Sequence, residues 1–147
     1  MKEKAIWPIF WALTGAFVVT FVVIATASFI PAVRGLLEGG WFFIISGILF
    51  FLLGVALLVL TVKGRVTGLI RRFLILAGAS STGIPVSVLL HNAIYGVFVY
   101  FFGEGFWDRI GIGDEPFFFI LAIIVCPIGF LVGAVGSIVL SIKKGRR

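Results

Sequence analysis

Residues 41–62 read WFFIISGILFFLLGVALLVLTV, an apolar stretch that contains no Asp, Glu, Lys or Arg. A helix that crosses the hydrocarbon core of a bilayer needs ~20 mostly apolar residues, so this stretch is long enough. Three further stretches pass the same test, at residues 6–33, 73–102 and 117–142. A membrane barrel would instead show ~10-residue segments of alternating polarity. The sequence therefore predicts an all-α integral membrane protein built as a four-transmembrane-helix bundle.

The composition fits a chain whose solvent is the bilayer. Of its 147 residues, 61% are hydrophobic and 12% are charged, whereas soluble domains average about 45–50% apolar and about 25% charged residues. Nearly all of residues 1–147 fall within the four stretches or the short segments that join them. We therefore expect a single membrane domain with the lipid bilayer as a partner and no separate soluble domain.

Lysine and arginine are distributed unevenly between the two sides that four spans would define. Ten of them fall in the two tails and in the link between the second and third stretches: Lys2, Lys4, Lys63, Arg65, Arg71, Arg72, Lys143, Lys144, Arg146 and Arg147. The opposite side holds only Arg34 and Arg109, together with five of the six acidic residues. Because basic residues are retained in the cytoplasm, we predict a multi-pass protein of the cell membrane with both termini cytoplasmic, an N-in/C-in topology.

The first stretch leaves one alternative open. Ala25-Thr26-Ala27 has the small-x-small form of a signal-peptide cleavage site. The apolar run before it is longer than the about 7–15 residues of a signal-peptide hydrophobic region, and this length favours a retained span. The basic residues do not decide between the two, because the other three spans would keep the same orientation after cleavage.

Several functional classes have little support in the sequence. The net charge of +6 could favour nucleic acid, but the cations sit at the ends of the spans, so no nucleic acid partner is expected. Cys126 is the only cysteine and His91 the only histidine, and we predict no metal site and no cofactor. The nucleophile-elbow, zinc-protease and phosphate-loop motifs do not occur, so an enzyme is not the class we favour.

The third stretch carries the candidate site. Helical geometry turns the chain by about 100° per residue, which puts Ser80, Ser87, His91 and Tyr95 on one stripe roughly 80° wide. Asn92 lies beside this stripe. Polar side chains that face lipid lose hydrogen bonds, at a cost of order kilocalories per mole each. We therefore expect this face to turn into the bundle or toward another subunit.

This polar stripe has a structural interpretation and a functional one. Polar contacts between membrane helices contribute about 0.6 kcal/mol each, and such packing is the interpretation that we prefer. The alternative is a ligand or proton site, because an ionisable residue inside the membrane is often functional. Pro85 and Pro127 favour the alternative slightly, since both predict helix kinks near mid-membrane, where transporters place binding sites. Proline is also frequent in membrane helices, and we prefer this simpler explanation.

Glycines mark the predicted helix-packing faces. Gly129, Gly133 and Gly136 fall on one side of the fourth stretch, and Gly47 and Gly54 fall on one side of the second. Small residues let membrane helices approach each other closely. We expect these faces to pack inside the bundle in preference to contacting another subunit.

The longest link, residues 103–116, reads GEGFWDRIGIGDEP. Its four glycines allow sharp bends, and its apolar residues predict a short helix or turn on the outer membrane surface. Carboxylates could hold a cation there through oxygen ligands. We interpret the acids instead as solvated loop residues that help to orient the protein: Glu104, Asp108, Asp114 and Glu115.

Three functions from different classes remain. The first is a structural or accessory subunit that packs with another membrane protein or with itself, and this is the function that we favour. The second is an oligomeric small-solute transporter or channel that uses the polar stripe of the third span. The third is a membrane redox or enzyme subunit that uses His91. A defined homo-oligomer would favour the second, whereas a stoichiometric second polypeptide would favour the first.

Overall fold

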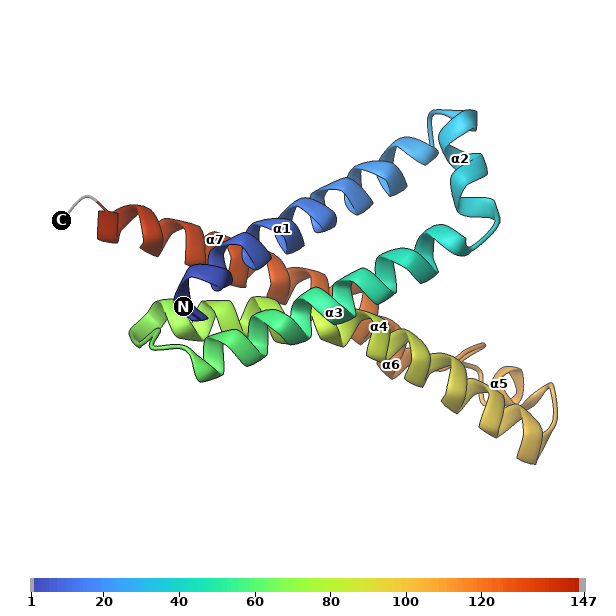
Figure 1. The fold of residues 1–147 in the computed structure, drawn as a ribbon. Helices are drawn as coiled ribbons and strands as arrows, with labels where there is room; N and C mark the ends of the chain where they lie inside the picture. The colour runs from blue at the N-terminus through green and yellow to red at the C-terminus, as the bar shows by residue number, and fades with distance from the viewer. Residues whose placement is uncertain (1, 146–147) are drawn as a thin grey trace.

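The computed structural model describes residues 2–145 and is 87% helical, with no strand in that range. Figure 1 shows the order of the elements along the chain. Their bounds are α1 Lys2–Ala27, α2 Pro31–Glu38, α3 Trp41–Lys63, α4 Gly68–Phe102, α5 Phe106–Arg109, α6 Pro116–Ile120, the π-helical turn η1 Leu121–Val125, and α7 Cys126–Gly145. Helices α6, η1 and α7 follow one another without a break and form one long segment.

Four of these segments are long and apolar enough to cross a membrane, namely Ala5–Ala27, Trp41–Lys63, Gly68–Phe102 and Pro116–Lys144. The prediction of an all-helical chain with four candidate spans is therefore confirmed. Helix α4, the third candidate span, begins at Gly68, five residues before the predicted start at Phe73. Arg71 and Arg72 near its start are not apolar, but they are compatible with a helix.

The first span is shorter than predicted. We expected one helix over residues 6–33, but α1 ends at Ala27, and α2 begins at Pro31. Proline restricts the residue before it to extended backbone, and Ile30 has that conformation, with φ −119° and ψ 109°. The apolar residues after Ala27 therefore form a turn and the start of a separate short helix, which connects α1 to α3.

The charged residues define two ends of the molecule. The tails and the α3–α4 turn, which carry the lysine and arginine clusters, lie at one end, and α2 and α5 lie at the other (Figure 1). We call these the basic end and the acidic end. Helix α4 packs against both α3 and α7, and α1 packs against α3.

The buried core lies in the half of the bundle nearer the basic end. Its members are Ile6, Phe10, Leu13, Phe50, Leu57, Leu74, Ala77, Phe130 and Ala134. No residue between positions 14 and 26 of α1, or between positions 41 and 49 of α3, is buried. Figure 1 shows the physical reason, because α1 and α3 diverge toward α2. The two halves of the bundle therefore differ in how closely their helices pack.

Glycines make the closest helix contacts in the packed half. A Cβ atom added to Gly54 of α3 would lie 2.9 Å from the carbonyl oxygen of Gly78 in α4. A Cβ atom on Gly133 of α7 would lie 2.6 Å from the backbone nitrogen of Ala77. These helices therefore approach backbone to backbone, as small residues allow in membranes.

The remaining predicted packing glycines divide into two groups. Added Cβ atoms at Gly129 and Gly136 would each come within 2.5 Å of a side-chain atom of α4. Gly47 makes only an ordinary contact, 3.6 Å to the Cβ atom of Pro85. Four of the five glycines thus lie at tight contacts inside the bundle, and Gly47 lies at its loosely packed edge.

Candidate functional site

His91 of α4 faces the two acidic residues that precede α6. Its Nδ1 atom lies 3.0 Å from the carbonyl oxygen of Glu115 and 3.3 Å from Oε2 of the same residue. Its Nε2 atom lies 3.5 Å from Oδ2 of Asp114. The His91 side chain is 16% exposed and the Glu115 side chain 7% exposed. This acid–histidine cluster joins α4 to the start of the fourth span.

Glu115 is held in place by the helix that it begins. Its Oε1 atom accepts a hydrogen bond from the backbone nitrogen of Phe117 at 2.8 Å, and Oε2 accepts one from that of Phe118 at 3.0 Å. Pro116 occupies the first helical position, where its missing N–H costs nothing. A carboxylate at a helix N-terminus is stabilised by the free N–H groups there. Glu115 is therefore a rigid partner for His91.

The hydrogen bonds of His91 identify its protonated nitrogen. A backbone carbonyl can only accept a hydrogen bond, so Nδ1 donates to Glu115. In a neutral ring Nε2 then presents a lone pair toward the Asp114 carboxylate, whereas an imidazolium would present an N–H.

A shallow groove of about 210 Å³ lies beside the cluster. Its lining residues are Val88, His91, Asn92, Phe119, Ala122 and Ile123. The Asn92 side chain is exposed, and its amide nitrogen donates to the carbonyl oxygen of Val88 at 2.8 Å. The groove therefore combines an imidazole and an amide with apolar walls.

The other residues of the predicted stripe lie outside this groove. Ser80 and Ser87 are buried, and Ser80 lies against Gly129 of α7. Tyr95 is 38% exposed and stacks on Trp107 of α5, with ring centroids 6.0 Å apart. Since Ser80 and Tyr95 are roughly 22 Å apart along the helix at ~1.5 Å per residue, the stripe is spread along α4 and is not one site. Its role in binding stays a prediction.

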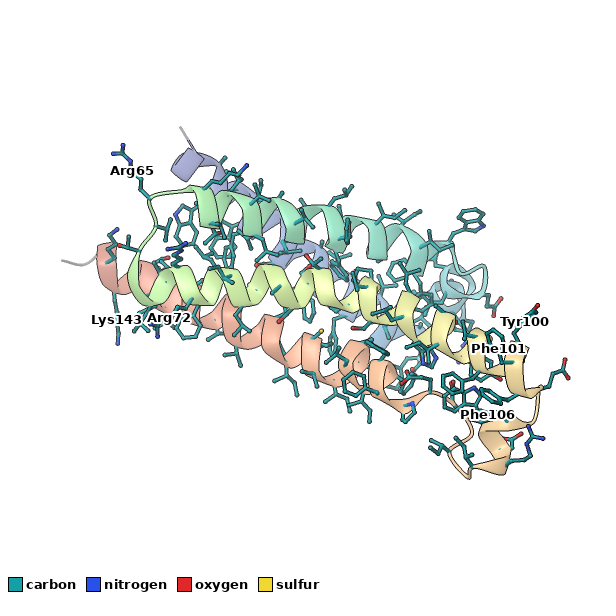
Figure 2. The ribbon with its side chains drawn as sticks, turned by 90° about the horizontal axis from the view of Figure 1, so that it is seen from below. Arg65, Arg72, Tyr100, Phe101, Phe106 and Lys143 are labelled. Atoms are coloured by element: carbon teal, nitrogen blue, oxygen red, sulfur yellow. The ribbon has the colours of Figure 1, made fainter. Side chains whose placement is uncertain are left out.

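The short helix α5 matches the short helix predicted for the 103–116 loop. The indole nitrogen of Trp107 donates to the carbonyl oxygen of Tyr95 at 3.5 Å. The Phe106 ring packs against Phe98 and Phe102, at centroid distances of 5.2 and 5.1 Å. Figure 2 shows Phe106 at the far end of α4. Aromatic packing thus holds the loop against α4 and brings its last residues to His91.

The two prolines have different surroundings. Helix α4 continues through Pro85 as one element, and Ser81 donates across the helix interface to the carbonyl oxygen of Phe50 at 3.0 Å. Pro127 lies two residues after the end of the π-helical turn η1, and the backbone N–H of Cys126 between them donates to the carbonyl oxygen of Leu121. A proline leaves one carbonyl without its usual donor, and π turns in helices are frequent at functional sites. The turn borders the groove through Ala122 and Ile123.

The structure corrects one interpretation of the loop acids. We interpreted all four as solvated, but Glu115 is buried and bound to His91, and Asp114 also contacts His91. The reason is that Glu115 caps a helix. The sequence Glu115-Pro116 before an apolar run is a helix-start signal, and this signal could have identified the buried acid.

Among the residues that the structure describes, no group of three or more His, Cys, Asp and Glu side chains is placed to hold a metal ion. The chain matches no protein-family model, no curated protein and no solved structure.

Proposed function

We propose that this chain is a small structural or accessory subunit that packs against another membrane protein or against a second copy of itself. The observation that carries the proposal is an exposed face in the acidic half of α4. It consists of Leu89, Asn92, Ala93, Gly96 and Tyr100, and all five residues are exposed. We call it the Asn92 face. By helical spacing, Leu89, Ala93, Gly96 and Tyr100 lie on the side of α4 opposite the polar stripe, and Asn92 lies at the edge of the face next to the stripe.

The Asn92 face has the composition of a helix interface. Membrane helices associate through small residues and through amide hydrogen bonds, and this face combines both. Gly96 has no atom within 4 Å of an added Cβ position, so a neighbouring helix has room to approach. Asn92 bonds only to its own helix within the described chain, and a partner could satisfy its carbonyl oxygen. Lipid would leave this polar atom unsatisfied at a cost.

The half of α4 nearer the basic end supports the view that small residues mark packing faces of this helix. There the small residues of α4 are covered, Gly78 by α3 and Ala77 by α7. At the acidic end Tyr100 is 83% exposed and points away from the rest of the molecule (Figure 2). A partner helix on the Asn92 face would continue along α4 the packing that α3 and α7 begin.

Native mass spectrometry of tagged, gently solubilised protein tests the proposal. We expect a stoichiometric second polypeptide or a defined homo-oligomer, and we expect Gly96→Leu and Asn92→Leu to disrupt it. Gly15→Leu is the matched control, because Gly15 of α1 is equally open but lies on another helix. A monomer without a bound polypeptide, or equal losses in Gly96→Leu and Gly15→Leu, would contradict the proposal.

We also infer that the basic end faces the cytoplasm, with both termini on that side of the cell membrane. The support is the clustering of lysine and arginine at that end, which the positive-inside rule links to cytoplasmic loops. Reporter fusions at the C-terminus and within residues 103–116 test this topology. The C-terminal fusion should report cytoplasm and the loop fusion the opposite side, and the reverse result would refute the topology.

A small-solute transporter is the second candidate, and the groove beside His91 favours it. Polar groups next to an irregular turn in a membrane helix resemble the broken-helix sites of transporters. Osmotic swelling of proteoliposomes in glycerol and in urea measures this activity. A transporter would give swelling above that of empty vesicles, and Ala122→Phe, which fills the groove, would abolish it.

A further inference from the structure

A second pocket, of about 350 Å³, opens at the basic end of the bundle. Its lining comes from α1, the α3–α4 turn, α4 and α7, so four segments far apart in the sequence build it. Arg65, Thr67, Ser141 and Lys144 supply its polar groups, and Trp7 and Leu74 belong to its apolar part. It is larger than the groove beside His91 and shares no residue with it.

The polar groups of this pocket suit a phosphate diester. An arginine can bind two phosphate oxygens at once, and a lysine acts as a point charge. The Thr67 hydroxyl accepts no capping bond from the backbone of α4, and as a hydroxyl it can also donate a hydrogen bond to a phosphate oxygen. The Ser141 hydroxyl donates to the carbonyl oxygen of Ser137 at 2.8 Å, and it therefore presents only acceptor lone pairs. Ser141 could accept a bond from a hydroxyl on a headgroup.

Positive charge is concentrated around the pocket. The exposed basic side chains at this end are Lys63, Arg65, Arg71, Arg72, Lys143 and Lys144. Among the side chains that the structure describes, none of these six forms a salt bridge. A bound anion would reduce their mutual repulsion. Basic pockets between membrane helices commonly hold anionic headgroups.

We propose that this pocket binds the headgroup of an anionic phospholipid. The apolar residues favour a lipid over a soluble phosphate, because they would contact the glycerol and upper acyl region while Arg65 and Lys144 hold the phosphate. Trp7 is half-buried in this pocket, and tryptophan prefers the depth of the lipid headgroups. The proposal does not depend on the accessory-subunit function, since it concerns the opposite end of the bundle.

Native mass spectrometry of the full chain with added phosphatidylglycerol tests the site. Replacing both pocket cations, Arg65→Gln with Lys144→Gln, should weaken binding roughly thirtyfold, since each basic residue near an anionic headgroup contributes about fivefold. Arg72→Gln with Lys143→Gln is the matched control, because it removes the same charge at the same end. Figure 2 shows Arg72 and Lys143 away from Arg65. The control should change binding by less than about threefold, because its exposed charges lie outside the pocket lining and are screened by solvent.

Several results would overturn the proposal. Equal weakening in the two double variants would show diffuse attraction without a site, and unchanged binding in the pocket variant would show that the pocket is not used. Displacement of the lipid by an equal concentration of glycerol phosphate would identify a soluble anion as the ligand.

Tryptophan fluorescence gives an independent measurement on the unaltered pocket. Phosphatidylglycerol with brominated acyl chains, added to vesicles of phosphatidylcholine, should quench the protein more than brominated phosphatidylcholine does. Trp7→Phe should remove that excess, whereas Trp41→Phe, at the acidic end, should keep it. An excess that persists in Trp7→Phe would place the lipid elsewhere and refute the site.

Discussion

The same apolar helices run through both halves of this bundle, but they pack differently in the two. In the basic half, Phe10, Leu57 and Leu74 are fully buried, whereas in the acidic half Phe21 of α1 is 65% exposed and Leu89 of α4 is 70% exposed. Lipid tails are as apolar as these side chains, so apolarity drives insertion but does not drive helices together. Apolar residues alone therefore do not explain where the helices of this chain touch.

Small residues explain the difference between the halves. In the basic half, Gly54 faces Gly78 and Gly133 faces Ala77, so the backbones of neighbouring helices meet. In the acidic half, Gly96 has no neighbour within 4 Å of an added Cβ position. Helices of this chain pack closely where small residues on two neighbouring helices face each other. A small residue that faces no other helix marks a surface without a partner in this chain. Four substitutions test this comparison.

The largest effect should come from a large side chain of the packed half. Phe10→Ala removes a fully buried ring and leaves a cavity, which typically costs about 3–5 kcal/mol. Phe21→Ala is the matched control, since its ring is 65% exposed, and it should cost less than about 0.5 kcal/mol. The free energy of unfolding in mixed micelles with sodium dodecyl sulfate measures both. Similar costs at the two positions would contradict the comparison.

Adding bulk at a glycine contact should have the next largest effect. Gly133→Val would put a Cβ atom 2.6 Å from the backbone of Ala77, and backbone cannot yield as a side chain can. We expect a loss of about 3 kcal/mol, the upper range for overpacking, in the same unfolding measurement. Gly15→Val serves as the control, because open space surrounds Gly15. If both variants unfold alike, the close approach of α4 and α7 is wrong.

The acid–histidine cluster is the main polar contact of the acidic half, and its loss should have a moderate effect. His91→Ala removes the donor to Glu115 and should cost about 1–2 kcal/mol. It should also speed hydrogen exchange of the amides in residues 103–115. His91→Asn keeps a donor at the position of Nδ1 and should exchange nearly as slowly as the unaltered protein. Fast exchange in the Asn variant, or slow exchange in the Ala variant, would show that His91 does not hold the loop.

The smallest effect should come from a single hydrogen bond between helices. Ser81→Ala removes the bond from the Ser81 hydroxyl to the carbonyl oxygen of Phe50. Such bonds contribute about 0.6 kcal/mol in membranes, and we expect a loss of that size in the unfolding measurement. Ser28→Ala, outside the spans and exposed, should leave the unfolding free energy unchanged. A loss above about 2 kcal/mol in Ser81→Ala would mean that this contact is part of a larger network.

Hydropathy predicted the four spans because length and apolarity act on each segment separately. The end of α1 was wrong by several residues, since an apolar turn before Pro31 has the same hydropathy as helix. The π turn before Pro127 was not predicted. The sequence shows that the backbone N–H donor is missing at Pro127, but it does not show which hydrogen bonds the neighbouring carbonyl groups then accept.

The contacts of the candidate site were harder to predict from the sequence than the four spans. His91 and Asn92 could be selected as polar residues within an apolar span, but the partners of His91 lie in a loop whose path depends on Gly111 and Gly113, with φ of 74° and 73°. Glycine makes that path possible without specifying it. The contact between His91 and Glu115 therefore emerges only when the aromatic packing of α5 is known.

Helix α4 also determines how the protein fits a bilayer of given thickness. Its apolar part, Phe73–Phe102, is roughly 45 Å long at ~1.5 Å per residue, whereas the hydrocarbon layer is about 30 Å thick. A longer helix adapts by tilting or by thickening the lipid around it. Because both α3 and α7 pack against α4, a change in the tilt of α4 would move these two helices with it. In a bilayer, a helix of this length would favour the thicker regions.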